Sequence, residues 1–116
     1  MRYKTVGDYN DPTVLNGRLL LDIDVAETGN VDMDFLIGFH ELIESWLCYK
    51  RGIKDKEISG FDIAHEESND PGRLKDAPYR KEHMFAERLE KMMARQLGVD
   101  WDEYWKVQDK VWEKTK

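Results

Sequence analysis

The period of the hydrophobic residues changes near residue 30, and this change limits the fold more than any other feature of the sequence. Before it, a leucine run followed by alternating apolar and acidic residues in RLLLDIDVAETGN (18–30) predicts a strand. A weaker strand candidate is RYKTV (2–6), which a turn at NDP follows. After residue 30, apolar residues recur at helical spacing in three segments. Strands followed by helices indicate an α+β fold, with a small N-terminal β-sheet packed against three helices.

The first predicted helix is capped by Asp32 or Asp34 and runs to about Arg51, where Gly52 ends it. Its apolar residues recur three and four positions apart, so we expect them to form the main buried face. These residues are Phe35, Leu36, Phe39, Leu42, Ile43, Trp46 and Leu47.

A polar connection covers residues 52–77 and is long for a structureless loop, which indicates either a functional loop or local structure. A second helix has Pro78 in its first turn and ends at Gly98. A third helix starts at Asp100 and carries a tryptophan stripe. We expect this stripe and the apolar residues of the second helix to pack in the core. The stripe is Trp101, Trp105 and Trp112, and the second helix carries Phe85, Leu89, Met92, Met93 and Leu97.

Length and composition exclude several classes of protein. The 116 residues predict one domain, 1–116. The net charge of −6 provides no basic excess for binding nucleic acid. Cys48 is the only cysteine, so no internal disulfide forms, and we expect it to be a small buried apolar residue. No apolar stretch approaches the ~20 residues of a membrane span, so we expect a cytoplasmic location.

The segment GFHELIESWL (38–47) places a histidine and two glutamates in the first helix. His40 and Glu44 are four positions apart and share one face, which apolar residues flank on both sides, while Glu41 falls on a more polar face with Ser45. The flanking residues are Leu36, Ile37, Leu47 and Cys48. A buried imidazole and carboxylate need partners, and a metal ion would supply one. A structural ion pair or hydrogen-bonded pair is the alternative.

A third metal ligand has to come from another segment. His83 lies early in the second helix, and Glu87 and Glu90 follow it along the edge of the apolar face. His65, in the polar connection, is the remaining histidine and a second candidate.

The segment LLLDIDVAETGNVDMDFLIGFHELIESWL resembles the core of a minimal zincin metallopeptidase, in which a strand and a short acidic connection precede a helix bearing H-E-x-x-H. The resemblance covers about residues 18–50 and is typical of small phage and prophage proteins. It implies that His40 and Glu44 bind zinc and that Glu41 is the catalytic base. This chain has Glu44 where the motif has its second histidine. With His83 from the second helix, the ligands would still be two histidines and one glutamate.

The leading hypothesis is therefore a zincin-like metalloprotein that binds Zn²⁺ through His40, Glu44 and His83. Glu41 would act as general base in the hydrolysis of a peptide, protein or other amide substrate. One alternative is a non-catalytic binding module that a metal stabilises and whose tryptophan-rich helix contacts a partner. Another is an all-helical nucleotide hydrolase that binds Mg²⁺ through carboxylates.

Overall fold

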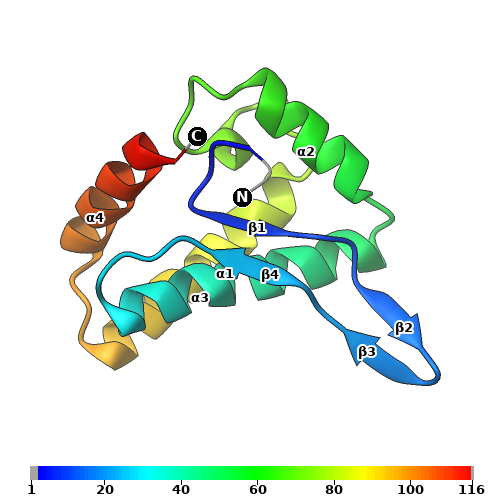
Figure 1. The fold of residues 1–116 in the computed structure, drawn as a ribbon, viewed down its shortest axis with the longest axis horizontal. Helices are drawn as coiled ribbons and strands as arrows, with labels where there is room; N and C mark the ends of the chain where they lie inside the picture. Colours follow the sequence, from blue (N-terminus) through cyan, green and yellow to red (C-terminus); the bar gives the residue numbers. More distant parts are fainter. Residues whose placement is uncertain (1–2, 116) are drawn as a thin grey trace.

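A computed structural model describes residues 3–115 and has an α+β fold (Figure 1). The strands are β1 (Gly7–Tyr9), β2 (Thr13–Leu15), β3 (Arg18–Leu20) and β4 (Ile23–Val25). The helices are α1 (Val31–Lys50), α2 (Asp55–Ala64), α3 (Arg80–Leu97) and α4 (Trp101–Lys114), with a 3₁₀ turn, η1 (Pro71–Arg73), before α3. The predicted α+β class is confirmed, and the all-helical alternative is wrong. The expected single sheet and three helices are corrected to two antiparallel two-stranded sheets and four α-helices within residues 3–115.

The strand predicted over residues 18–30 is two short strands in different sheets. β3 pairs with β2 across a two-residue turn at Asn16 and Gly17, whose φ angles of 52° and 74° suit an Asn-Gly hairpin. β4 pairs with β1 in the register Gly7↔Val25. The strand expected at residues 2–6 is also misplaced, because pairing begins at Gly7; of that segment, Arg2 lies outside the described residues. The β2–β3 hairpin projects from the body of the molecule (Figure 1).

The start of α1 differs from the prediction, whereas its end agrees with it. Asn30 is the N-cap, and its side chain accepts hydrogen bonds from the backbone N–H groups of Asp32 and Met33. Asp32 and Asp34 therefore lie in the first turn, where their negative charges favour the helix dipole. At the other end, Gly52 has a φ of 74° and ends the helix as expected.

The connection over residues 52–77 contains the local structure that its length suggested, because α2 and η1 lie within it. The second predicted helix begins two residues later than expected, at Arg80, so Pro78 precedes α3. Gly98 ends α3 in the left-handed conformation, and Asp100 caps α4 by accepting a hydrogen bond from the backbone of Glu103.

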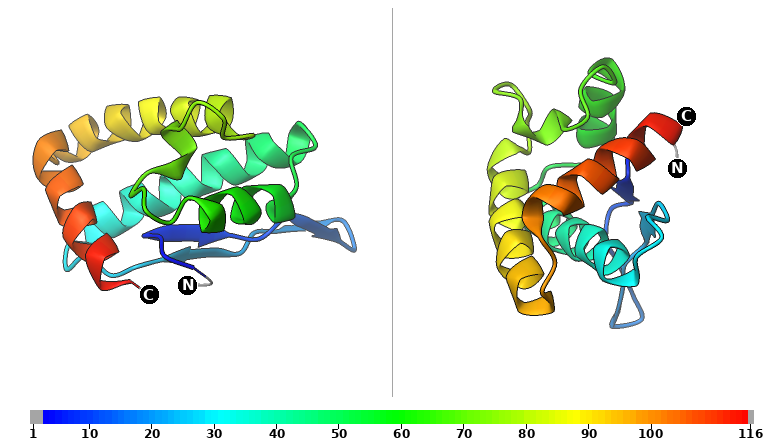
Figure 2. Two further views of the ribbon diagram at one scale, coloured as in Figure 1. Left: turned by 90° about the horizontal axis from the view of Figure 1, so that it is seen from above. Right: turned by 90° about the vertical axis from the view of Figure 1, so that its left-hand side faces the viewer.

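Helices α1 and α3 pack side by side and run antiparallel, while β1 and β4 cover another side of α1 (Figure 2). The contacts of His40 with Glu90 and of Glu44 with His83 show that the two helices are antiparallel, because the residue number rises along α1 as it falls along α3. No helix in the described part of the chain is long and apolar enough to cross a membrane.

The buried faces of α1 and α3 are more polar than the helical wheel predicted. On α1, Phe35 is 51% exposed, and Leu42 and Trp46 are also exposed. On α3, Met92 is 62% exposed, and Phe85 also faces solvent. The residues buried instead include Ser45, Cys48, Ala86 and Ala94, together with His40, Glu44, Glu87 and Glu90. Cys48 is buried as expected. The core positions expected for six residues are wrong, because α1 and α3 turn polar side chains toward a shared cavity. These residues are Phe35, Leu42, Trp46, Phe85, Met92 and Leu97.

The tryptophan stripe of α4 is only partly buried. Trp101 packs against the apolar cluster around Leu36 and Tyr104. Trp105 lines the central cavity, and Trp112 lies under the Lys4 ammonium, 4.2 Å from the ring centre. The three tryptophans thus lie in three different environments.

Candidate metal centre

His40 and Glu44 occupy adjacent turns of α1 and point toward α3. Their residues are 7% and 4% exposed, respectively. The i, i+4 spacing on a helix brings Nε2 of His40 within 2.9 Å of Oε2 of Glu44. The structure thus places this pair on the buried side of the helix, as the flanking apolar residues predicted.

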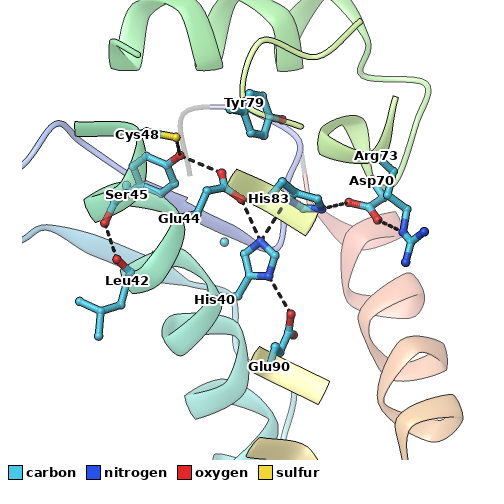
Figure 3. A network of polar contacts seen from close by, with 12 residues as sticks. His40, Leu42, Glu44, Ser45, Cys48, Asp70, Arg73, Tyr79, His83 and Glu90 are labelled. Carbon is cyan, nitrogen blue, oxygen red and sulfur yellow. Dashed lines mark hydrogen bonds and ion pairs between the residues drawn. The ribbon is translucent and has the colours of Figure 1, made fainter. Parts of the chain in front are cut away.

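His83 completes a triangle of ligand atoms with this pair (Figure 3). Its Nδ1 lies 2.8 Å from Oε2 of Glu44 and 3.1 Å from Nε2 of His40. Three potential metal ligands from two helices therefore converge on one point. His40, Glu44 and His83 are the three residues that the sequence predicted as ligands.

Each member of the triangle also has an outer partner. Nδ1 of His40 lies 2.7 Å from Oε1 of Glu90, and Nε2 of His83 lies 2.8 Å from Oδ1 of Asp70. A carboxylate behind a histidine fixes the ring orientation and raises the basicity of the nitrogen that faces inward, as in many metal centres. Behind Glu44, the Tyr9 hydroxyl donates to Oε1 at 2.8 Å.

Protonation of both histidines is the alternative way to satisfy these contacts. Burial lowers the pKa of each ring, but hydrogen bonds to carboxylates outweigh it and raise the pKa of His40 well above its usual value and that of His83 to about 10. Burial raises the pKa of Glu44, but its hydrogen bonds to both histidines lower the pKa by more than burial raises it, so the net shift is downward. Without an ion, the cluster is thus a network of close contacts between two histidine rings and buried carboxylates.

Glu41 lines the same cavity but contributes no atom to the triangle. Burial and the nearby charge of Glu44 raise its pKa well above that of an ordinary glutamate. The side chain packs against the backbone of β1, since a Cβ added to Gly7 would lie 2.8 Å from Oε1 of Glu41. The polar face predicted for Glu41 and Ser45 is wrong in part, because Ser45 is buried and Glu41 is half-buried.

Gly72, in η1, leaves the space that the ring of His83 fills. A Cβ at this position would lie 2.5 Å from Nδ1 of His83 and 2.8 Å from Cδ2. Real Cβ atoms do not approach other atoms so closely, so only glycine fits against the ring in its present position.

The cavity around the triangle is small and acidic. Its volume is about 70 Å³, well below the ~300–1,000 Å³ typical of sites for larger ligands. Seven of the residues that line it carry a carboxyl group, whereas two are histidines and none is lysine or arginine. This excess of acidic groups favours a bound cation.

The other two candidate ligands contribute no atom to the triangle. The Nδ1–H of His65 donates to the carbonyl of Phe61 at 2.8 Å, and the His65 ring stacks on Phe61. Glu87 lies in a second cluster with Asp70 and His83.

Sequence reasoning missed the outer partners Tyr9, Asp70 and Tyr104, the last of which donates to Oε2 of Glu90. Only Asp70 had a signal, because it belongs to the long connection that suggested function.

Comparisons of the chain with protein families, curated proteins and solved structures found no match.

Proposed function

We propose that this chain is a zinc-dependent amide hydrolase in which His40, Glu44 and His83 bind Zn²⁺ and Glu41 is the general base. The observation that carries this proposal is the triangle of ligand atoms, each with its own outer partner. A zincin-like arrangement would agree with the order of elements, since β4 leads through a short connection into α1.

The geometry supports zinc because little movement would admit the ion. Ligand atoms around a tetrahedral zinc, with bonds of about 2.0–2.1 Å, lie about 3.3 Å apart. The edges of the triangle are 2.8, 2.9 and 3.1 Å, so each has to lengthen by only a few tenths of an ångström. Two neutral imidazole nitrogens and one carboxylate form a common set of catalytic zinc ligands, which leaves a fourth position for water or substrate.

The residues around the ion would then have separate roles in catalysis. When bound, zinc would supply a Lewis acid that lowers the pKa of water and polarises an amide carbonyl. Glu90 would hold the ring of His40 with its lone pair directed inward. The carboxylate of Asp70, 2.8 Å from Nε2 of His83, would favour the position of that ring by its charge. Glu41, which lines the same cavity, would accept the proton of the attacking water.

The cavity restricts the substrate class. About 70 Å³ has room for an ion, water and a group of a few heavy atoms, but not for a polypeptide segment. We therefore favour a small amide, or a peptide of which only the scissile group enters the cavity.

Activity of the Glu41→Gln variant tests the catalytic part of this proposal. A panel of aminoacyl p-nitroanilides serves as substrate for zinc-loaded protein. General-base catalysis contributes roughly 10²–10⁴-fold, so Glu41→Gln should lose at least about 100-fold in kcat/KM while it keeps the bound zinc. The matched control is Glu82→Gln, which changes a buried glutamate of α3 that pairs with Arg51 outside the cavity. Equal hydrolysis by Glu41→Gln and wild type would exclude Glu41 as the base.

A structural role for the ion is the second candidate, and the burial of His40 and Glu44 favours it. A non-catalytic module would bind zinc stoichiometrically and unfold at a lower temperature when chelated. It would hydrolyse none of the substrates, and Glu41→Gln would change nothing in these assays.

A further inference from the structure

A second group of metal-ligating side chains lies beside the triangle and shares His83 with it. Ligand atoms of Asp70, His83 and Glu87 all lie within 4.8 Å of one another. His83 and Glu87 are one turn apart on α3, and Asp70 directly precedes η1. The inward Nδ1 of His83 belongs to the triangle, whereas its Nε2 faces Asp70 (Figure 3).

The same three residues hold most of the unsatisfied buried polar atoms of the described chain. Within residues 3–115, four buried side-chain atoms have no hydrogen-bond partner, and three of them are Oδ2 of Asp70, Nε2 of His83 and Oε1 of Glu87. The contact between His83 and Asp70 is short but lacks the alignment of a hydrogen bond. Glu87 is only 6% exposed, so its unsatisfied oxygen is costly without a cation.

Arg73 supplies only part of the missing positive charge. Its Nε lies 3.1 Å from Oδ2 of Asp70, and its Nη2 pairs with Oε2 of Glu87. The guanidinium lies on the side of Asp70 away from His83, and its side chain is 51% exposed (Figure 3). One arginine thus faces two carboxylates through Oδ2 of Asp70 and Oε2 of Glu87, and it leaves Oε1 of Glu87 without a positive partner.

We propose that Asp70, His83 and Glu87 form a second divalent-cation site, for an ion such as Zn²⁺, that shares His83 with the first site. One imidazole nitrogen and two carboxylate oxygens suit zinc. With both sites filled, His83 would bind one ion through Nδ1 and the other through Nε2 as an imidazolate, and the protons of both ring nitrogens would have left to solvent. The second site goes beyond the proposed hydrolase and does not depend on its activity.

Zinc stoichiometry in a set of variants tests this proposal. Each protein is equilibrated with Zn²⁺, desalted and analysed by mass spectrometry for zinc per chain. The expected values are two ions for wild type and for the Glu82→Gln control, and one for Glu87→Gln. His40→Ala should also bind one ion, because it removes a ligand from the first site alone. Circular dichroism checks folding, and Asp70→Asn provides a second variant that should lose the same ion as Glu87→Gln.

The outcomes separate this site from the proposed hydrolase centre. Wild-type stoichiometry in both Glu87→Gln and Asp70→Asn overturns the second site. One ion in wild type, none in His40→Ala and one in Glu87→Gln means that only the first site exists, and this also overturns the proposal. One ion in His40→Ala and none in Glu87→Gln supports the second site and overturns the first. A wild-type protein without zinc overturns both.

Discussion

The substitution Gly72→Ala tests whether the ring of His83 is held where the triangle needs it. A methyl group at this position would lie 2.5 Å from Nδ1 and 2.8 Å from Cδ2 of the ring. Ordinary contacts begin near 3.4 Å, so the ring would have to move by roughly 1 Å. Metal–ligand distances tolerate only about ±0.2 Å, and His83 would therefore lose its position as a ligand.

The magnitude follows from the cost of overpacking a buried site, which is about 1–3 kcal/mol. If the clash weakens only zinc binding, the Kd for zinc rises about 5- to 140-fold, since 1.4 kcal/mol corresponds to about tenfold. If the clash destabilises the folded protein without the ion, the free energy of unfolding of the chelated protein falls by the same ~1–3 kcal/mol. The two measurements together should recover the full cost.

Competition with a chelating dye gives the Kd for zinc, and urea unfolding with chelator gives the stability. The matched control is Gly60→Ala in α2, because a Cβ there meets no atom within 4 Å. Gly60→Ala should keep the wild-type Kd and stabilise the helix by roughly 0.5–1 kcal/mol. Wild-type affinity and stability in Gly72→Ala would refute the packing of His83 against Gly72 and the triangle built on it.

Three further predictions concern other parts of the site. Glu90→Gln should weaken zinc binding about 10–100-fold, because His40 loses its charged outer partner; an unchanged Kd in the dye competition would contradict this role. Zinc at 100 times its Kd should stabilise the wild-type fold by about 2.7 kcal/mol, and calorimetry should show that a chelator removes this gain; identical melting with and without chelator would argue against a bound ion. Burial raises the pKa of Asp62 from 3.8 to about 6, although Tyr3 and Tyr79 donate to it. Its stabilising contribution is therefore complete below about pH 4 and is lost as the pH rises through 6. Relative to Asp62→Asn, chelated wild type should lose up to about 3 kcal/mol between pH 4 and 7 in urea unfolding, and parallel profiles for the two proteins would be the contrary result.

Local signals predicted the helices better than the strands. Gly52, Gly98 and Asp100 mark helix ends in the sequence and in the structure, because capping depends on a few adjacent residues. The strands could not be placed as well, since a three-residue strand carries little periodicity. The leucine run that suggested one long strand instead turns into β3 and β4, which pair with different partners.

The sequence by itself determined that His40 and Glu44 share one face of a helix, because the α-helical repeat sets the i, i+4 neighbours. It also indicated that this face is flanked by apolar residues. It did not determine which face of α1 is buried: the wheel assigns the interior to the most apolar side, whereas Phe35 and Trp46 are exposed. The tertiary structure decided which face is buried, because α3 brings His83 and Glu90 against α1 and a shared acidic cavity takes the place of an apolar contact.

The tertiary structure also decided between the two histidines that the sequence offered for the third position of the triangle, of which His83 was the leading candidate. His65 and His83 were both candidates, and the antiparallel packing of α1 and α3 brings His83 to within 2.8 Å of Glu44. The outer partners are equally non-local, since His40 and Glu90 are 50 residues apart. Contacts between such distant residues depend on how the helices pack, which no local pattern of residues encodes.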